Sequence, residues 1–381
     1  MQNRGVYIHI PFCSVKCHYC SFYTVYYHRS GKSLEPYLDT LGEEIRLHSL
    51  NPDIHDRPID SIYIGGGTPS LLKADSVETL LNTLRGYLPL VDLKELTIEI
   101  NPEDGDQQKF REYRSLGINR VSIGVQSMQD KLLEISGRNH RRQEIHKTLL
   151  GLQQAGFENI SVDLLLGMPG QTEEHLREDL KLLWDYPLRH ISLYILTLEE
   201  RSPWFHQEKK IEIAEDTVAD LYGELVAGLN EKGFQQYEIS NFAQPGFEGY
   251  HNAKYWNYDE YLGLGTAAYS FLGKERFNNF QSMTRYRKAV ESGQIPIEKK
   301  EILSWEKQLA EFIFLSLRKT RDGLNIKQVN QLFQIDFLSR YEETLHRFLD
   351  LRLLFLKDQR LCLTPAGVLV SDSIFSEFMT V

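Results

Sequence analysis

The stretch Cys13-Ser-Val-Lys-Cys17-His-Tyr-Cys20 holds three of the four cysteines of the chain and follows directly after the apolar run Val6–Ile10. Spacings of three and two residues let successive sulfurs wrap one compact centre, as thiolate ligation of an iron–sulfur cluster requires. Three thiolates can hold three irons of a four-iron cluster and leave the fourth iron open. The alternative is a zinc site completed by His9 or His18, but structural zinc usually takes two Cys-x-x-Cys-like pairs, and the sequence has no second pair. The spacing therefore favours a cluster.

The composition is that of an ordinary globular protein, with 41% hydrophobic and 25% charged residues among 381. This length suits a main domain with a smaller one attached. The formal net charge is −10, whereas a protein that binds a phosphate backbone is expected to be basic. The charge balance therefore argues against a nucleic-acid partner.

No targeting or membrane segment is visible in the sequence. The first residues lack a charged segment followed by an apolar one, and no apolar run approaches the roughly 18–20 residues of a membrane span. Three clustered cysteines and a lone Cys362 do not form a plausible disulfide framework. We therefore expect a reducing, cytoplasmic compartment in which the thiols are free to bind metal.

Apolar runs alternate with amphipathic segments over the first two hundred residues, and Leu116-Gly117 and Ala155-Gly156 stand where helices would end. This rhythm predicts parallel βαβ units with right-handed crossovers, in either a partial (β/α) barrel or an open doubly wound sheet. The expected strands are Val6–Ile10, Ser61–Ile64, Leu96–Ile100, Val121–Val125, Ile160–Leu166 and Ile191–Leu196. The expected helices are Pro36–His48, Ser76–Tyr87, Gln107–Leu116, Gln143–Ala155 and Glu173–Trp184.

The rhythm changes after about Gly233. Tyr237–Tyr261 is rich in aromatic residues, Asn, Gly and Pro and is expected to be irregular structure laid across an opening, while Gly263–Tyr269 suits a close backbone approach. A winged-helix outline follows: helices over about Trp305–Lys319, Ile326–Phe333 and Leu338–Leu349, a hairpin of Leu353–Leu356 with Leu361–Leu363, and a last helix from about Ala366. The acidic chain favours a packing or partner-docking role for this unit over DNA reading. The predicted domains are residues 1–235, a region over 236–300 that covers the first, and 301–381.

Five ordered motifs resemble one known family. They are Tyr7-Ile-His-Ile-Pro-Phe-Cys13 with the cysteines that follow, Gly65-Gly-Gly-Thr-Pro-Ser70, Glu99-Ile-Asn-Pro102, Ser122-Ile-Gly-Val-Gln-Ser127 and Asp163-Leu-Leu-Leu-Gly-Met-Pro-Gly-Gln-Thr172. Together with Tyr237-Glu-Ile-Ser-Asn-Phe-Ala243 and the winged unit, they look like the oxygen-independent coproporphyrinogen oxidase-like radical S-adenosylmethionine (SAM) enzymes over nearly the whole chain. The resemblance implies an α/β fold: a partial (β/α)6 radical SAM barrel followed by a small C-terminal winged-helix-like domain.

Within that family, two features resemble the HemW branch, whose members are regarded as haem chaperones. The decarboxylating oxidases carry a further cysteine two positions beyond the third, where this chain has Phe22. The segment His251-Asn-Ala-Lys-Tyr-Trp256 is similar to an element associated with haem binding in that branch. The resemblance implies delivery of haem to target haem proteins, with a homodimer and a peripheral membrane contact compatible with it. A true coproporphyrinogen oxidase and a metal-stabilised interaction protein are the alternatives.

The resemblance also assigns the site residues. Cys13, Cys17 and Cys20 hold a [4Fe-4S] cluster whose open iron takes the methionine group of SAM, and His251 is the candidate haem ligand. The expected SAM contacts are Tyr7, Tyr19, Gly66, Gly67, Thr68, Glu99, Gln126, Arg138 and Asp163. No catalytic residue is assigned.

Several of these residues have a plainer interpretation from residue type alone. Glu99 would cap the next helix, Arg138 would be a solvated surface charge, and His251 would be a structural hydrogen-bonding residue in an aromatic loop. Gln126 and Asp163 lie on or at the ends of buried strands, where barrel proteins place their sites and where a buried polar group needs a partner. A polar ligand is a natural partner for both.

Overall fold

The computed structural model describes residues 3–27, 34–104, 106–210 and 215–379. A twelve-stranded sheet in the order β14-β13-β12-β11-β1-β4-β5-β6-β7-β8-β10-β9 organises the fold. Its middle six strands are parallel and follow one another in chain order. They are β1 (Arg4–Ile10), β4 (Ile59–Gly66), β5 (Leu90–Ile100), β6 (Arg120–Gln126), β7 (Asn159–Leu166) and β8 (His190–Ile195). A doubly wound sheet reverses its order near the middle, so this unreversed order confirms the partial (β/α)6 barrel.

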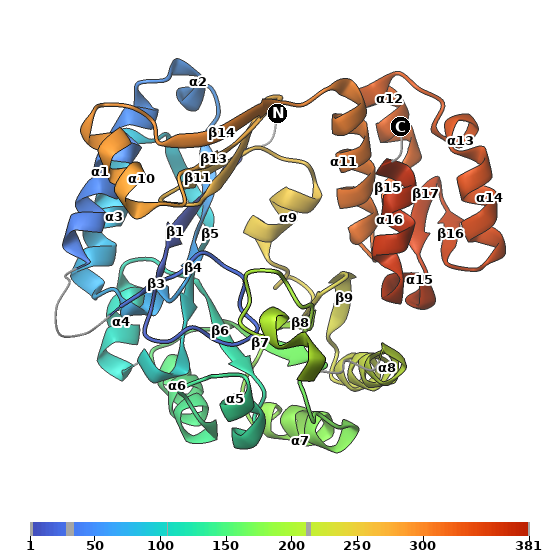
Figure 1. Ribbon diagram of the computed structural model, residues 1–381, viewed down its shortest axis with the longest axis horizontal. Helices are drawn as coiled ribbons and strands as arrows, with labels where there is room; N and C mark the ends of the chain where they lie inside the picture. Colours follow the sequence, from blue (N-terminus) through green and yellow to red (C-terminus); the bar gives the residue numbers. More distant parts are fainter. Residues whose placement is uncertain (1–2, 28–33, 105, 211–214, 380–381) are drawn as a thin grey trace.

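Helices cover the outer face of these strands, as Figure 1 shows. They are α1 (Glu35–Ser49), α3 (Ala74–Tyr87), α4 (Gln107–Ser115), α6 (Arg142–Gln154), α7 (Glu173–Leu183) and α8 (Glu215–Glu231), with the shorter α2 (Pro52–His55) and α5 (Asp130–Ile135) between them. Successive strand residues point to opposite faces, and in β1 the residues Val6, Ile8 and Ile10 are fully buried in the core. The intervening Tyr7 and His9 line a cavity on the other face. The inner face of the barrel is therefore polar and aromatic.

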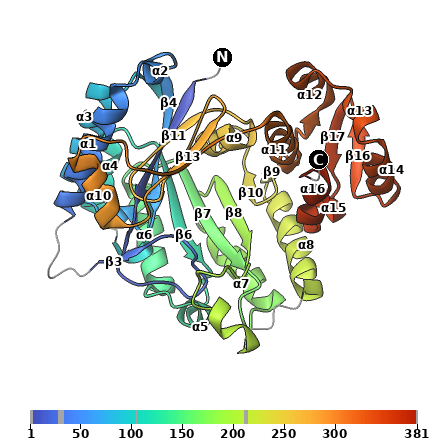
Figure 2. The same cartoon turned by 45° about the horizontal axis from the view of Figure 1, so that its top comes forward.

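The sheet continues beyond the barrel at both ends. On the β1 side lie β11 (Tyr261–Leu264), which is parallel to β1, and the antiparallel strands β12 (Tyr269–Leu272), β13 (Glu275–Asn279) and β14 (Ile297–Ile302), with α10 (Met283–Glu291) between the last two. On the β8 side lie β10 (Asn241–Ala243) and β9 (Gln235–Glu238), both antiparallel to their neighbours. Figure 2 shows these short strands between the barrel and the C-terminal helices.

The expectation of irregular structure over Tyr237–Tyr261 is wrong, because this stretch contains β10, half of β9 and the helix α9 (Tyr250–Trp256). Strands of three or four residues take their stability from pairing with the sheet, which local composition does not reveal. The close backbone approach expected at Gly263–Tyr269 is confirmed: a Cβ on Gly263 would lie 2.0 Å from the carbonyl oxygen of Tyr269. Residues 236–300 thus supply strands to both edges of the twelve-stranded sheet. The boundaries between the three domains stay a prediction.

The C-terminal unit has the winged-helix outline, drawn in orange and red in Figure 1. Its elements are α11 (Trp305–Arg318), β15 (Leu324–Asn325), α12 (Ile326–Phe333), α13 (Phe337–Arg340), α14 (Glu342–Asp350), β16 (Leu354–Lys357), β17 (Arg360–Leu363), α15 (Pro365–Leu369) and α16 (Ser371–Met379). The expected hairpin is β16–β17, and β15 adds a third strand. The helix expected over Leu338–Leu349 is two helices, because the backbone of Tyr341 leaves the helical region between them.

The C-terminal unit is joined to the barrel by polar contacts between α11 and the β9–β10 turn. Arg318 Nη2 lies 3.1 Å from Glu238 Oε2, and the amide of Ile239 donates to the Arg318 carbonyl oxygen at 3.1 Å. Across the ranges described above, no helix combines the length and apolar character that crossing a membrane requires.

Candidate functional site

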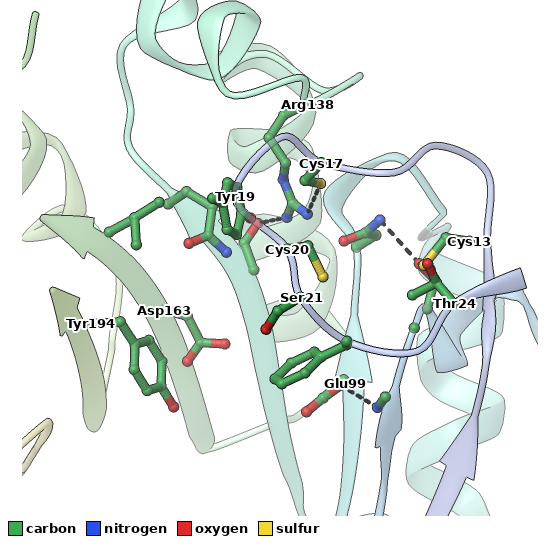
Figure 3. A pocket seen from close by; sticks show the side chains of 18 of the residues that line it. Cys13, Cys17, Tyr19, Cys20, Ser21, Thr24, Glu99, Arg138, Asp163 and Tyr194 are labelled. Atoms are coloured by element: carbon green, nitrogen blue, oxygen red, sulfur yellow. Dashed lines mark hydrogen bonds between the residues drawn. The ribbon is translucent and has the colours of Figure 1, made fainter. Parts of the chain in front are cut away.

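A cavity of about 380 Å³ lies between the cysteine loop (residues 13–20) and the carboxyl ends of β4 to β8. We call it the cluster-side cavity. Figure 3 shows Cys13, Cys17 and Cys20 on the loop side and Glu99, Asp163 and Tyr194 on the strand side. Sites of α/β barrels lie at the carboxyl ends of their strands, so the cavity lies where this architecture places ligands.

The cysteine loop is held by backbone bonds on both sides. The short strands β2 (Phe12–Cys13) and β3 (Val25–Tyr26) pair in parallel, and the amide of Val25 donates to the Pro11 carbonyl at 2.7 Å. The amide of Tyr27 donates to the Cys13 carbonyl at 2.8 Å. The loop therefore has a defined path that does not depend on its thiols.

All three thiols are free and line the cavity. Burial raises the pKa of Cys13 to about 11, although a hydrogen bond from Thr68 Oγ1 at 3.5 Å opposes the shift. Burial also raises the pKa of Cys20. Cysteine binds metal as the thiolate and releases its proton when it does so. Cys13 and Cys20 accordingly stay protonated at neutral pH until a metal centre binds.

The donor geometry bears on the choice between a cluster and a single zinc ion. Within the described ranges, no group of three or more His, Cys, Asp or Glu side chains is arranged to hold one metal ion. His9 Nδ1 lies 2.9 Å from the Tyr7 hydroxyl and its Nε2 lies 3.2 Å from the Tyr23 carbonyl, so both nitrogens of this candidate zinc ligand have other partners. His18 Nδ1 lies 2.8 Å from the Ile135 carbonyl. In a four-iron cluster each thiolate binds a different iron, so the sulfurs need not converge on one point. The donor set fits a cluster better.

The glycines at the end of β4 allow close contacts with β1 and with the cysteine loop. A Cβ on Gly67 would lie 2.7 Å from the Phe12 carbonyl oxygen and 3.0 Å from Cys13 Sγ. Gly66 has a φ of 118°, which side chains rarely adopt, and a Cβ there would lie 2.6 Å from the His9 ring. Gly67 therefore permits a close contact with the cysteine loop and Gly66 one with His9 of β1. Gly66, Gly67 and Thr68 all line the cavity.

Replacing Gly67 by alanine should displace the cysteine loop. We expect the free energy of unfolding to fall by about 1–3 kcal/mol, as overpacking of a close contact does, and reconstituted iron to fall with it. The matched control is Gly86→Ala in α3, where a Cβ would meet nothing within 4 Å. That change should raise the free energy of unfolding by roughly 0.5–1 kcal/mol. Chemical denaturation and iron analysis measure both effects; equal behaviour of the two variants would contradict the proposed contact.

Two carboxyl groups face the cavity from the strands. Glu99 Oε1 accepts a hydrogen bond from the Tyr63 hydroxyl at 2.8 Å and Oε2 from the Gly66 amide at 2.9 Å. Burial raises the pKa of Glu99 to about 7 against the effect of these two bonds. Burial also raises the pKa of Asp163, which accepts from Ser122 Oγ at 3.2 Å. The bonds of Glu99 run to β4 rather than to the helix that follows, so the capping interpretation does not apply.

Arg138 is not a solvated surface charge. Its guanidinium donates to the Gly124 carbonyl and, at 3.4 Å, to Cys17 Sγ. A Cβ on Gly124 would lie 2.6 Å from Arg138 Nη2, so the glycine in β6 is needed for this approach. Gln126 ends the same strand with a φ of 67° beside a register shift. Such a bulge re-aims a side chain, and Gln126 lines the cavity.

The cluster-side cavity brings together most of the expected SAM contacts: Tyr19, Gly66, Gly67, Thr68, Glu99, Gln126, Arg138 and Asp163. Tyr7 lies in an adjoining cavity, where its hydroxyl is 2.9 Å from His9 Nδ1. The sequence interpretation missed Tyr63, Ser122 and Tyr194, which also line the cluster-side cavity. The sequence did contain a signal for these three residues. Each of them alternates with apolar core residues along its strand, so its side chain points to the inner face of the barrel.

His251 is not brought together with these residues. It lies in α9 with 1% of its surface exposed and lines neither cavity. Its Nδ1 is 3.0 Å from Ser61 Oγ and its Nε2 is 2.9 Å from the Tyr255 hydroxyl. Burial, with Lys254 and Arg120 nearby, lowers the pKa of His251 to about 3. The imidazole is therefore neutral at neutral pH, and both its nitrogens have partners.

Comparison with known proteins shows the family to which the chain belongs. Residues 7–209 match the family model of the Radical SAM superfamily, and residues 303–370 match that of the HemN C-terminal domain. The heme chaperone HemW of Lactococcus lactis is 34% identical and covers 99% of this chain and 98% of its own length. HemW of Bacillus subtilis is 31% identical and covers 99% of both. This chain belongs to the HemW family of the radical SAM superfamily.

HemW-family membership agrees with the fold. The solved structure of coproporphyrinogen III oxidase (HemN) from Escherichia coli aligns with a TM-score of 0.85, at 23% identity, and covers 100% of this chain and 91% of that one. At this identity the likeness shows the architecture alone. Membership of the radical SAM superfamily implies a [4Fe-4S] cluster and SAM as cofactors, and the three thiols and the polar cavity described above fit both.

Proposed function

We propose that this HemW-family protein is a haem chaperone, which binds haem together with a SAM-associated [4Fe-4S] cluster and transfers the haem to target haem proteins. Similarity over almost the full length to proteins named heme chaperone HemW carries the proposal. The free cysteines, which lie beside a cavity with polar acceptors, support it.

The proposed cofactor roles follow the cavity lining. Cys13, Cys17 and Cys20 would hold the cluster and leave one iron for SAM; when bound, the cluster can supply an electron to the sulfonium. Around SAM, Glu99 and Asp163 would accept hydrogen bonds, and Arg138 would pair with the carboxylate of the ligand. The remaining contacts are assigned to Tyr7, Tyr19, Gly66, Gly67, Thr68 and Gln126.

The second candidate is a coproporphyrinogen oxidase that decarboxylates its substrate by radical chemistry. Its support is the similarity of the fold to HemN. Phe22 argues against it, because the oxidases have a cysteine at that position. The Phe22 side chain is 64% exposed and lines both cavities, so no sulfur stands at that point of the site. We therefore do not assign coproporphyrinogen oxidase activity to this chain.

We further propose a cytoplasmic location and a homodimer with a peripheral membrane contact. The four free cysteines suit a reducing compartment. The net charge of −10 gives no reason to expect a nucleic-acid partner.

Anaerobic reconstitution followed by two titrations tests the proposed function. Added SAM should change the electron paramagnetic resonance spectrum of the reduced cluster, because it occupies the open iron. Added haem should give a saturable Soret band, and an apo-haem protein should then receive the haem. Coproporphyrinogen supplied with SAM and a reductant is the control reaction: formation of its vinyl product would defeat the chaperone proposal in favour of the oxidase.

A further inference from the structure

A second cavity of about 750 Å³ adjoins the cluster-side cavity. We call it the tyrosine cavity, because seven of its described lining residues are tyrosines: Tyr7, Tyr23, Tyr63, Tyr194, Tyr255, Tyr261 and Tyr269. Phe22, Tyr63, Glu99 and Tyr194 line both cavities. A ligand in the tyrosine cavity would therefore lie directly beside the cluster-side cavity.

The chemistry of the tyrosine cavity suits a planar aromatic macrocycle. Its volume is within the range of sites that bury small ligands, and aromatic rings offer flat apolar walls. Asn252, Gln281 and the exposed Arg201 also line it and offer hydrogen-bond donors, beside the carboxyl groups of Glu99, Glu199 and Glu200. Haem has this combination of an apolar ring and charged carboxylates at its edge, so the cavity fits the cargo of the proposed function.

Helix α9 presents two of its residues to this cavity and turns a third away. Asn252 and Tyr255 line the tyrosine cavity, whereas His251 does not. The His251 ring packs against Tyr63, with ring centroids 5.5 Å apart, and lies behind Tyr255, whose hydroxyl is 2.9 Å from Nε2. A direct bond from His251 to haem iron would need Nε2 to leave Tyr255 or Nδ1 to leave Ser61.

The placement of α9 is fixed by buried polar contacts. Glu95 Oε2 accepts from the Tyr250 amide at 2.7 Å, and Lys254 Nζ lies 2.8 Å from Asp60 Oδ1. Tyr250 donates its hydroxyl to Asp60 Oδ2 at 2.6 Å. Turning the helix to present His251 would break these contacts, and uncompensated buried charges are costly.

We infer that haem binds in the tyrosine cavity with the Tyr255 oxygen as its iron ligand, and that His251 is a positioning residue that holds Tyr255 from behind. The inference rests on the proposed haem-binding function. Phenolate is an established axial ligand for haem iron, and a hydrogen bond from the residue behind a ligand fixes its orientation.

When the Tyr255 oxygen binds the iron, one proton is released. The Tyr255 O–H bond breaks, the oxygen forms a bond to ferric iron, and the proton leaves through the cavity to solvent, with no change of oxidation state. Neutral His251 can support both states: its Nε2 accepts from the phenol, or, in the other tautomer, donates to the phenolate. Ser61, at Nδ1, can accept or donate accordingly, because a hydroxyl does both.

Haem titration of Tyr255→Phe and His251→Gln tests the inference. We expect Tyr255→Phe to weaken ferric haem binding on the order of 100-fold and to remove the phenolate-to-iron charge-transfer band. His251→Gln should keep that band and weaken binding by about tenfold, the size typical of a group behind a ligand. Resonance Raman and paramagnetic resonance spectra of the ferric complex report the ligand type independently of affinity.

A matched control comes from a second tyrosine–histidine pair. The Tyr186 hydroxyl bonds His146 Nδ1 on the surface, and neither residue lines the tyrosine cavity. Tyr186→Phe should leave the titration unchanged, and reconstituted cluster content checks that each variant is folded. The inference is overturned if the wild-type spectrum shows imidazole ligation that persists in Tyr255→Phe and disappears in His251→Gln. That result would leave the proposed haem-chaperone function standing. A folded wild-type protein that gives no saturable Soret band overturns the proposed function itself.

Discussion

Replacing Cys13, Cys17 or Cys20 by serine should abolish the [4Fe-4S] cluster in each case. Every one of the three thiols lines the same cavity, and in a cluster with three protein ligands the loss of one leaves two irons without a protein sulfur. We expect reconstituted iron to fall from about four atoms per chain to below one. The response of the paramagnetic resonance signal to SAM should disappear with it.

The fold should survive these serine substitutions. The cysteine loop keeps its backbone bonds from Val25 to Pro11 and from Tyr27 to Cys13 without any thiol. We therefore expect the free energy of unfolding of the metal-free protein to change by less than about 1 kcal/mol. Circular dichroism and denaturant titration measure this difference.

Cys362→Ala is the matched control for the three serine variants. Cys362 is 5% exposed in β17 of the C-terminal unit, beside Gly323 and outside the cluster-side cavity. Its iron content should equal that of the wild type. Full iron content in any of the three serine variants, or one zinc and no sulfide in the wild type, would remove the three-thiolate cluster from this protein.

The barrel could be predicted because its strands carry a local signal. Each parallel strand contains a short apolar run, because its outward residues pack against the helices and are buried. The strand run at Ile160–Leu166 and the helix stop at Ala155-Gly156 both appear in the structure within one or two residues. The choice of a barrel over a doubly wound sheet came from the family resemblance, because strand order is a long-range property.

The orientation of His251 could not be predicted. The segment His251-Asn-Ala-Lys-Tyr-Trp256 contains two side chains able to bind iron, and helix geometry alone does not say which one faces a cavity. Ser61 on β4 and Glu95 on β5 decide it, through contacts across more than a hundred residues of sequence. Motif similarity finds the segment, whereas only the packing of α9 shows that Tyr255 faces the tyrosine cavity.

SAM affinity should fall as the pH drops below about 7, and Glu99→Gln should remove most of that dependence. Burial raises the pKa of Glu99 to about 7 from an ordinary 4.5, and the ionised carboxylate is the form that accepts hydrogen bonds from a cationic ligand. We expect about tenfold weaker binding at one pH unit below the pKa. Above it, Glu99→Gln should lose about 1.5–3 kcal/mol of binding free energy, on the order of 10- to 100-fold.

The same substitution should act on stability in the opposite direction. A carboxyl group whose pKa is raised by folding keeps its proton where the unfolded chain has lost it. The folded state therefore loses stability as the pH rises from about 4.5 to about 7. Glu99→Gln removes this loss, so the metal-free variant should be more stable than the wild type above pH 7 by roughly 3 kcal/mol.

Denaturant titrations and SAM equilibrium binding at several pH values measure the two effects on the same samples. Glu78→Gln, on the exposed face of α3, is the control and should change neither. A Glu99→Gln protein that binds SAM as tightly as the wild type above pH 7 would remove Glu99 from the ligand contacts. If Glu99→Gln gains stability and loses SAM affinity, then the Glu99 carboxylate serves ligand binding and not folding. Its buried charge would then lower the stability of the folded state.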